Sequence, residues 1–380
     1  MIDSRVSRRR VLVGAAAVTA CAFPMINNGM FQAHAASPRR YAKRVVDLIH
    51  ESIVIDMLGP LTLDFGPKSF SGELTEQQTA DFRASGITAF HNSTGIGGRN
   101  AYDLVLAFVA AWSGFVGRNT HLFRLVDHAG DIDAAKHEDR IGVIVGLQDS
   151  DHFRTVDDVK SFYELGQRCS QLTYNSQNLI GAGCTERADP GLSDYGVSIV
   201  KAMNLVGMLV DTSHCGDRTT LDAIATSSVP IAITHSNCRA LNNHPRTKTD
   251  EAIRALGAKG GVMGITGVRN FVSATEPTTI GNVVDHIDHV VKLIGVDHVG
   301  IGTDADLYGY DQMPAAAYAA LKANYKGSYA FRDKIDIEAF SGPTKMYNLV
   351  EELVRRNYSN DNIRAILGGN FRRLLGATWK

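Results

Sequence analysis

The chain has 380 residues, of which 44% are hydrophobic and 21% are charged, and its formal net charge is −1. These values are ordinary for a globular protein, and they exclude a disordered chain, a collagen-like fibre and a polytopic membrane protein. The near-neutral charge argues against nucleic acid as a partner, because nucleic-acid binders present a basic face. The length suits two small domains or one large α/β barrel.

The first 35 residues have the pattern of an export signal. Arginines at positions 8–10 directly precede an apolar run over residues 11–22, and residues 33–35 (Ala-His-Ala) fit a small-x-small cleavage site. Paired arginines at this place are typical of the twin-arginine route, so we predict a signal peptide over residues 1–35 and a periplasmic or secreted protein. The apolar run is too short for a transmembrane span. Two alternatives stay open: an amphipathic N-terminal helix and, from a weak lipoprotein box at residues 18–21, a lipid-anchored form.

Cleavage after residue 35 would leave four cysteines in the mature chain, Cys169, Cys184, Cys215 and Cys238. None has the C-x-x-C spacing of a metal site, so cysteine ligation is not expected. An oxidising periplasm permits disulfides, and the sequence leaves their pairing open.

Residues 36–380 are predicted to form one domain, because they contain no internal repeat, low-complexity tract or linker. Taken in chain order, short apolar runs predict strands at residues 53–56, 87–91, 141–148, 171–174, 208–212, 231–234, 261–265 and 299–302, with a ninth short run at 123–126. Amphipathic patterns predict helices at residues 102–116, 157–165, 196–205, 218–226, 280–293, 344–356 and 360–367. Ser359 is expected to cap the last helix, and Gly368-Gly369 to end it.

The continuous apolar character of these strands indicates a parallel sheet buried on both faces, with helices between the strands. Eight such units over about 330 residues predict an α/β fold, the (β/α)8 TIM barrel. A doubly wound open sheet is the second choice. It would need a Gly-rich phosphate loop after the first strand, and residues 57–60 (Met-Leu-Gly-Pro) lack that spacing.

Polar residues end several predicted strands, which is where a barrel gathers its catalytic groups. His214 and His235 lie one strand–helix unit apart, and Asp304 follows the last strand. Two imidazoles and a carboxylate at one barrel mouth predict a zinc pocket, in which Asp304 takes a proton from a polarised water. The alternative is that each histidine only caps its strand by bonding to backbone.

Several sequence words around these histidines are distinctive: Gly-Cys-Thr-Glu at 183–186, Gly-Met-Leu-Val-Asp-Thr-Ser-His at 207–214, His-Ser-Asn-Cys-Arg-Ala-Leu at 235–241 and Gly-Asn-Phe-Arg-Arg-Leu-Leu at 369–375. With them, most of residues 45–378 resembles the membrane (renal-type) dipeptidases, metallopeptidase family M19 of the amidohydrolase superfamily. The resemblance implies an amidohydrolase-like barrel with two zinc ions at its mouth. In that family the ligands are a His-x-Asp pair, a bridging glutamate and two histidines.

The resemblance carries four residues over directly. His214 and His235 occupy the positions of the two zinc-binding histidines. Arg246 occupies the position of the arginine that pairs with the dipeptide carboxylate, and Asp304 that of the aspartate that moves the proton.

Four other positions depart from the family pattern. Leu58 and Pro60 stand in place of the His-x-Asp pair, Gln148 in place of the bridging glutamate, and Tyr174 in place of the histidine that contacts the scissile group. Leucine and proline cannot ligate zinc, and glutamine is a weak neutral ligand. We therefore expect one zinc ion at most, or none, held by the two histidines and Gln148, although a catalytic zinc usually has three strong protein ligands. The third ligand stays open among Asp56, Asp149 and Asp151.

Two functions follow from this pattern. The first is an exported dipeptidase-like hydrolase of a dipeptide or other small amide with a free carboxylate, with Asp304 and Tyr174 as catalytic residues and Arg246 and Tyr174 as substrate-binding ones. The second is a repurposed barrel without peptidase activity, serving as a binding or accessory protein or as a metal-free tailoring enzyme in the periplasmic maturation of a peptide-derived product. Family members often dimerise, so the resemblance also implies a homodimer.

Overall fold

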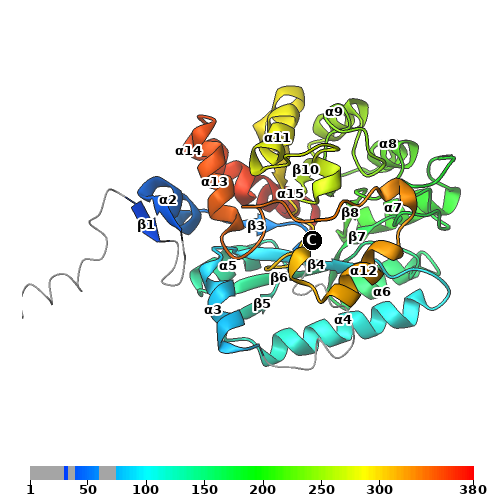
Figure 1. The fold of residues 1–380 in the computed structure, drawn as a ribbon. Helices are drawn as coiled ribbons and strands as arrows, with labels where there is room; N and C mark the ends of the chain where they lie inside the picture. The colour runs from blue at the N-terminus through cyan, green and yellow to red at the C-terminus, as the bar shows by residue number, and fades with distance from the viewer. Residues whose placement is uncertain (1–29, 33–38, 60–73) are drawn as a thin grey trace, which may run out of the picture.

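The computed structural model describes residues 30–32, 39–59 and 74–380. Its main sheet is a closed barrel of eight parallel strands in the order β3, β4, β6, β7, β8, β9, β10 and β11, with β11 pairing back onto β3 (Figure 1). The predicted TIM barrel is therefore confirmed. The predicted signal peptide lies outside the described residues, apart from the three of β1 (Met30–Gln32), which pair antiparallel with β2 (Arg40–Ala42).

Every described strand of the barrel is buried, which the continuous apolar runs predict for most of them. The barrel strands are β3 (Ile55–Asp56), β4 (Ala89–Thr94), β6 (Ile141–Leu147), β7 (Gln167–Gln171), β8 (Leu209–Asp211), β9 (Ala232–Ser236), β10 (Val262–Ile265) and β11 (Val299–Ile301). The extra strand β5 (Phe123–Leu125) pairs with the first half of β6, and β7 pairs with the second half.

Helices surround the barrel (Figure 1). The longer ones are α2 (Lys43–Glu51), α3 (Glu76–Ala84), α4 (Ala101–Arg118), α5 (Gly130–His137), α6 (Asp157–Glu164), α7 (Asp194–Val206), α8 (Asp217–Thr226), α9 (Asp250–Ala258), α11 (Ile280–Ile294), α12 (Ala315–Ala323), α13 (Lys345–Arg355) and α15 (Asn370–Thr378). Shorter elements are α10 (Arg269–Val272), α14 (Asn360–Arg364) and the single turns η2 (Val296–His298), η3 (Tyr310–Gln312), η4 (Gly327–Tyr329) and η5 (Ala365–Gly369).

Local capping explains why several helices begin and end where they do. The Ser193 hydroxyl accepts from the Gly196 amide at the start of α7, and Gly207, at φ +92°, ends that helix in the left-handed region. The Ser359 hydroxyl caps α14 in the same way, which confirms that prediction.

Two predicted boundaries are wrong. The fourth barrel strand is β7, not residues 171–174. Its Gln-Arg-Cys-Ser-Gln sequence lacks an apolar run, and its polar side chains are buried and hydrogen-bonded, as Gln167 is with His152. The last helix does not end at Gly368-Gly369. It passes through a π turn and continues as α15, and Gly368 is required there because a Cβ would meet the Ile53 carbonyl at 2.4 Å.

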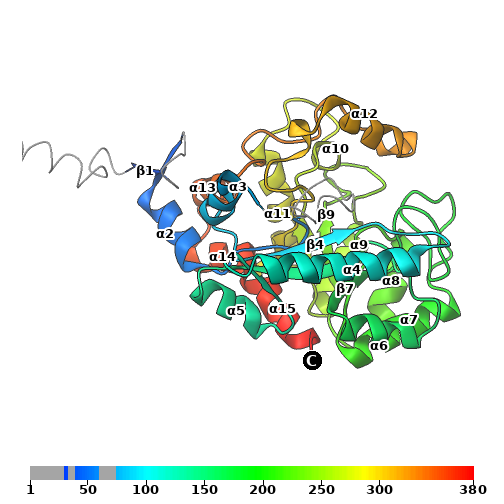
Figure 2. The same cartoon turned by 90° about the horizontal axis from the view of Figure 1, so that it is seen from below.

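The carboxyl ends of the strands open towards one side of the molecule. Figure 2 shows α10 and α12 on that side and the C-terminus on the opposite one. The segment from Tyr310 to Ile335, which includes η3, α12 and η4, joins β11 to α13 and reaches over this barrel mouth. Loops at the carboxyl ends of the strands are where a TIM barrel carries its site.

Candidate active site

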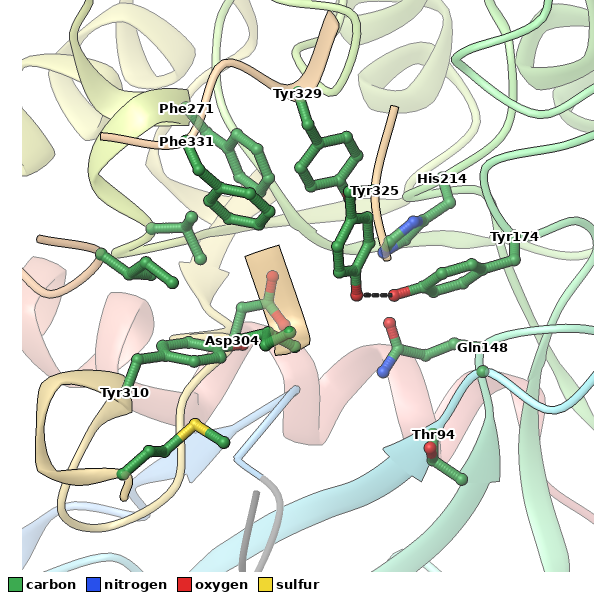
Figure 3. Close-up of a pocket in the computed structure, with 15 residues that line it drawn as sticks. Thr94, Gln148, Tyr174, His214, Phe271, Asp304, Tyr310, Tyr325, Tyr329 and Phe331 are labelled. Carbon is green, nitrogen blue, oxygen red and sulfur yellow. Dashed lines mark hydrogen bonds between the residues drawn. The ribbon is translucent and has the colours of Figure 1, made fainter. Parts of the chain in front are cut away.

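A cavity of about 240 Å³ opens at the barrel mouth (Figure 3). Its polar wall comes from residues at or just after the strand ends: Thr94, Gly95, Gln148, Tyr174, His214 and Asp304. Its apolar and aromatic wall comes from the loop after β10 and from the Tyr310–Ile335 segment: Val268, Phe271, Tyr310, Met313, Leu321, Tyr325, Tyr329, Phe331 and Ile335.

The two predicted histidines do meet. The Nε2 atoms of His214 and His235 lie 2.9 Å apart, and both rings are buried. The Nδ1 atom of His214 faces the side-chain oxygen of Asn175 at 2.8 Å, an oxygen that also accepts from the Tyr329 hydroxyl. The Nδ1 atom of His235 faces the Thr234 hydroxyl at 2.8 Å, whose own proton goes to Asp211. Both Nδ1 atoms therefore carry the proton.

It follows that two bare nitrogen lone pairs point at each other. Burial, and then the charge of Arg246, lower the pKa of both histidines well below the ordinary value, so both rings are neutral at pH 7. Two converging lone pairs repel, and a cation shared between them removes that repulsion. Neutral imidazole nitrogens are the ordinary protein ligands of zinc.

The remaining ligands are weaker. Among the residues that the structure describes, no three His, Cys, Asp or Glu side chains gather into a group that could hold a metal. Gln148 follows β6 in the cavity wall, and its amide nitrogen donates to the Ser93 carbonyl at 3.3 Å, which leaves its amide oxygen for a ligand. The two imidazoles could hold one ion between them, and Gln148 lines the same cavity as His214.

The three aspartates left open as a third ligand all accept hydrogen bonds from other residues. Asp56 is fully buried and accepts from both the backbone and the hydroxyl of Thr303, and Lys345 lies 3.3 Å from it, so its carboxylate already has partners in the fold. Asp149 accepts from the Asn178 side chain, and Asp151 accepts from the Gly98 amide. Leu58 is buried, and Pro60 lies outside the described residues.

Asp304 is held in the cavity by an unusual backbone. Its φ of +58° lies in the left-handed region, which aspartate tolerates better than most residues, and its amide donates to the Leu58 carbonyl at 2.8 Å. The preceding Thr303 is anchored on Asp56, and Lys345 donates to the carbonyl of Ala305 at 3.4 Å. Burial raises the pKa of Asp304 to about 7, with Arg246 opposing that rise.

Tyr174 lies flat between two neighbours. Its ring stacks on His214, with centroids 4.2 Å apart and an interplanar angle of 20°. On another side is Gly95, where an added Cβ would lie only 3.0 Å from the Tyr174 ring. Its hydroxyl bonds to the hydroxyl of Tyr325 at 2.8 Å (Figure 3). Burial raises the pKa of Tyr174 well above the ordinary value, so the phenol stays protonated at neutral pH.

Arg246 is fully buried and is not among the residues that line the cavity. Its two terminal nitrogens donate to the carbonyls of Ser213 and His235, its Nε has no partner in the described structure, and its guanidinium lies 5.1 Å from the Phe271 ring centroid. Arg246 therefore ties together the backbones that carry both histidines. Its role with a substrate carboxylate stays a prediction.

The sequence predictions missed the aromatic wall. Tyr310, Tyr325, Tyr329 and Phe331 belong to the segment after β11, for which no element was predicted, and Phe271 lies in the short α10. The sequence does contain a signal for this wall, namely five tyrosines between residues 308 and 329. So many amphipathic rings in one connecting segment indicate that the segment packs over a binding site.

The barrel, the bare imidazole pair and the carboxylate at its mouth define an amidohydrolase-type protein. Residues 70–323 match the membrane dipeptidase family (peptidase family M19), and the chain belongs to that family.

Relatives and solved structures are similar over different spans. The chain is 40% identical to dipeptidase verJ of Clonostachys rogersoniana over 171 residues, and 32% identical to an uncharacterized dipeptidase, C965.12, of Schizosaccharomyces pombe over 191 residues. These matches span 44% and 48% of this chain and 44% and 46% of the relatives, so the chain matches under half the length of either one. A crystal structure of an amidohydrolase from Pseudomonas aeruginosa is 28% identical, with a TM-score of 0.76 over 88% of this chain and 99% of that one.

Proposed function

We propose that this protein is a dipeptidase-like hydrolase that cleaves a small amide with an apolar side chain in the cavity at its barrel mouth. The observation that carries the proposal is that Asp304, with a pKa raised to about 7, faces the same cavity as His214, whose Nε2 is bare. A base with a pKa near the working pH is what general base catalysis requires. The 40% identity to a named dipeptidase over the shared segment supports the same activity.

The chemistry is an addition followed by an elimination. Asp304 takes a proton from water as the water oxygen bonds to the amide carbon, and the electron pair of the C=O bond moves to its oxygen. Asp304 then returns that proton to the nitrogen as the oxygen's electron pair re-forms the C=O bond and the C–N bond breaks, releasing an amine and a carboxylic acid. His214 and His235 would hold the zinc ion, which when bound supplies Lewis-acid polarisation of the reacting oxygens.

The size and lining of the cavity set the substrate class. A volume of about 240 Å³ lies below the roughly 300–1,000 Å³ range of sites for drug-sized ligands, so a dipeptide-sized molecule suits it. The wall opposite the strand ends carries Val268, Leu321 and Ile335 together with the aromatic rings. A cationic side chain is disfavoured because Arg246 offsets the charge of Asp304, so among the described residues the cavity offers no unpaired anion. The substrate therefore carries a neutral branched or aromatic side chain beside the scissile amide.

The test is amine release from a panel of dipeptides by the mature chain supplied with zinc. Leu- and Phe-containing dipeptides are expected to be cleaved with a kcat/KM at least ten times that of Gly-Gly or Lys-containing ones. Equal rates across the panel would refute the substrate class, and no release from any member would refute the hydrolase.

We further propose that the protein is exported by the twin-arginine route and acts in the periplasm or outside the cell, on the pattern of residues 1–35. No described helix is long and apolar enough to cross a membrane. Fractionation of cells that produce the full chain, with Arg8 and Arg9 changed to lysine as the control, tests this. Retention of the altered chain in the cytoplasm supports export by this route, and unchanged distribution refutes it.

The second function, a repurposed barrel without peptidase activity, is favoured by one observation. The family resemblance aligns Leu58 with a metal-binding position, and the structure buries this apolar side chain fully. The second function predicts that the wild-type protein binds apolar dipeptides and hydrolyses none of them. It also predicts that the Asp304→Asn variant binds them with unchanged affinity.

A further inference from the structure

Tyr325 reaches the polar wall of the cavity from a distant part of the chain. It follows α12 in the segment that extends over the barrel mouth, 151 residues after Tyr174, and the two hydroxyls lie 2.8 Å apart (Figure 3). Ring contacts hold it in place: its centroid lies 4.5 Å from that of Tyr329 and 5.3 Å from that of Phe331. The position of its hydroxyl is therefore determined by packing and not by a single bond.

The same segment is attached to the loop after β7 at two further points. Lys326 donates to the Thr185 carbonyl at 3.1 Å and lies 3.3 Å from a Glu186 carboxylate oxygen. The Tyr329 hydroxyl donates to the Asn175 side-chain oxygen at 3.3 Å, the same oxygen that orients His214. These contacts place the segment against the loop that carries Tyr174.

A count of protons shows what the two phenols offer a ligand. Each hydroxyl has one proton, and the bond between them uses one of the two. Among the described residues neither hydroxyl makes a further hydrogen bond, so the second proton is available to the cavity that both residues line. A phenol that accepts a hydrogen bond becomes a stronger donor, because hydrogen bonds in a chain polarise one another.

We propose that Tyr174 and Tyr325 act as one catalytic unit, whose free O–H donates to the scissile carbonyl oxygen and to the oxyanion that forms from it. Tyr174 sits beside the His214 ring at the polar end of the cavity, where the reacting amide must lie for Asp304 and the imidazole pair to reach it. The assignment rests on the proposed function for the identity of the reaction. It adds Tyr325, which comes from the Tyr310–Ile335 segment and not from a strand end. A donor of this kind stabilises the charge that develops on oxygen and is worth about 10²–10³ in kcat.

The experiment measures binding and turnover separately. The probes are a phosphinate analogue of an apolar dipeptide, which presents a tetrahedral oxyanion, and the matching reduced isostere, in which a CH2 replaces the carbonyl. Both are titrated into wild type, Tyr325→Phe, Tyr174→Phe and the double variant. Tyr163→Phe is the control, because that hydroxyl donates to the Lys380 carbonyl at the C-terminus and lies outside the cavity.

Tyr325→Phe is expected to weaken phosphinate binding at least tenfold and the reduced isostere less than threefold. The double variant is expected to lose no more than about the larger single loss, because the two hydroxyls act as a unit. Equal losses for both probes, additive losses or no loss in Tyr325→Phe would overturn the proposal. Discrimination between the probes with no turnover of any amide would support the phenol pair and refute the proposed hydrolase, so the two failures are distinguishable.

Discussion

Replacing Asp304 by asparagine separates the activity of this site from its effect on stability. In the folded chain burial raises the pKa of Asp304 from its ordinary 3.8 to about 7. The unfolded state therefore releases this proton at lower pH than the folded state does. Since the folded pKa lies above the unfolded one, ionisation favours unfolding, and stability is lost as the pH rises from about 4 to about 7.

The size of the effect follows from the two pKa values. A full shift to about 7 corresponds to roughly 4 kcal/mol of lost stability above pH 8, and about 3 kcal/mol of it develops between pH 5 and pH 8.5. Asparagine has the same shape and cannot ionise. Asp304→Asn should therefore gain about 2–3 kcal/mol more over wild type at pH 8.5 than at pH 5, while losing about 10²–10⁴ in kcat as the general base is removed.

The assay is urea denaturation at pH 5 and pH 8.5, together with amine release. Asp149→Asn is the matched control, because burial and then Asp151 raise the pKa of Asp149 to about 7 as well, and Asp149 does not line the cavity. Both variants should show the pH-dependent gain in stability, and only Asp304→Asn should lose turnover. A gain for Asp304→Asn that is equal at the two pH values, or a loss at pH 8.5, would refute the reasoning.

Three further predictions follow from the same structure. Lys345→Met leaves Asp56 buried without its cation and should lower the free energy of unfolding by about 3–5 kcal/mol in urea denaturation. Lys322→Met, which removes bonds to two backbone carbonyls and a contact with the Tyr318 ring but leaves no buried charge unpaired, should lose much less. Equal losses would contradict the role given to the buried pair. His214→Gln should bring bound zinc close to zero by elemental analysis. The control His289→Gln, which loses a bond to Asp250, should bind zinc as wild type does. Undiminished zinc in His214→Gln would place the metal elsewhere. Gly95→Ala puts a methyl group 3.0 Å from the Tyr174 ring and should lower kcat/KM by about tenfold through displacement of that ring. Gly117→Ala, where nothing lies within 4 Å of the added methyl group, is the control. An unchanged rate in Gly95→Ala would mean that the placement of Tyr174 does not matter.

The barrel could be predicted from the sequence because most of its buried strands are continuous apolar runs. Even the polar residues after those runs, His214 and Asp304, were found by position alone, since the carboxyl ends of parallel strands meet at one mouth. Strand β7 is misplaced by the prediction for the opposite reason. Its buried residues are polar, and they are hydrogen-bonded to partners outside the strand, such as His152, which no apolar pattern reveals.

The aromatic wall could not be predicted because no local periodicity records which loop crosses the barrel mouth. The contact between Tyr174 and Tyr325 spans 151 residues and depends on how the whole segment packs. The same holds for Arg246. The family resemblance implies a ligand for a carboxylate, and the position of Arg246 in the fold shows a guanidinium bonded to the carbonyls of Ser213 and His235. Burial of a charge against backbone oxygens has no signature in the order of residues.

The proposed activity is hydrolysis of an apolar dipeptide at one metal-supported site at this barrel mouth. Zinc per chain and turnover of a Leu-containing dipeptide, measured on the same sample across a zinc titration, test it most directly. Turnover is expected to rise with bound zinc and to reach its plateau at no more than one ion per chain. Two ions per chain at full activity would contradict the site described, and no turnover at any zinc loading would contradict the hydrolase itself.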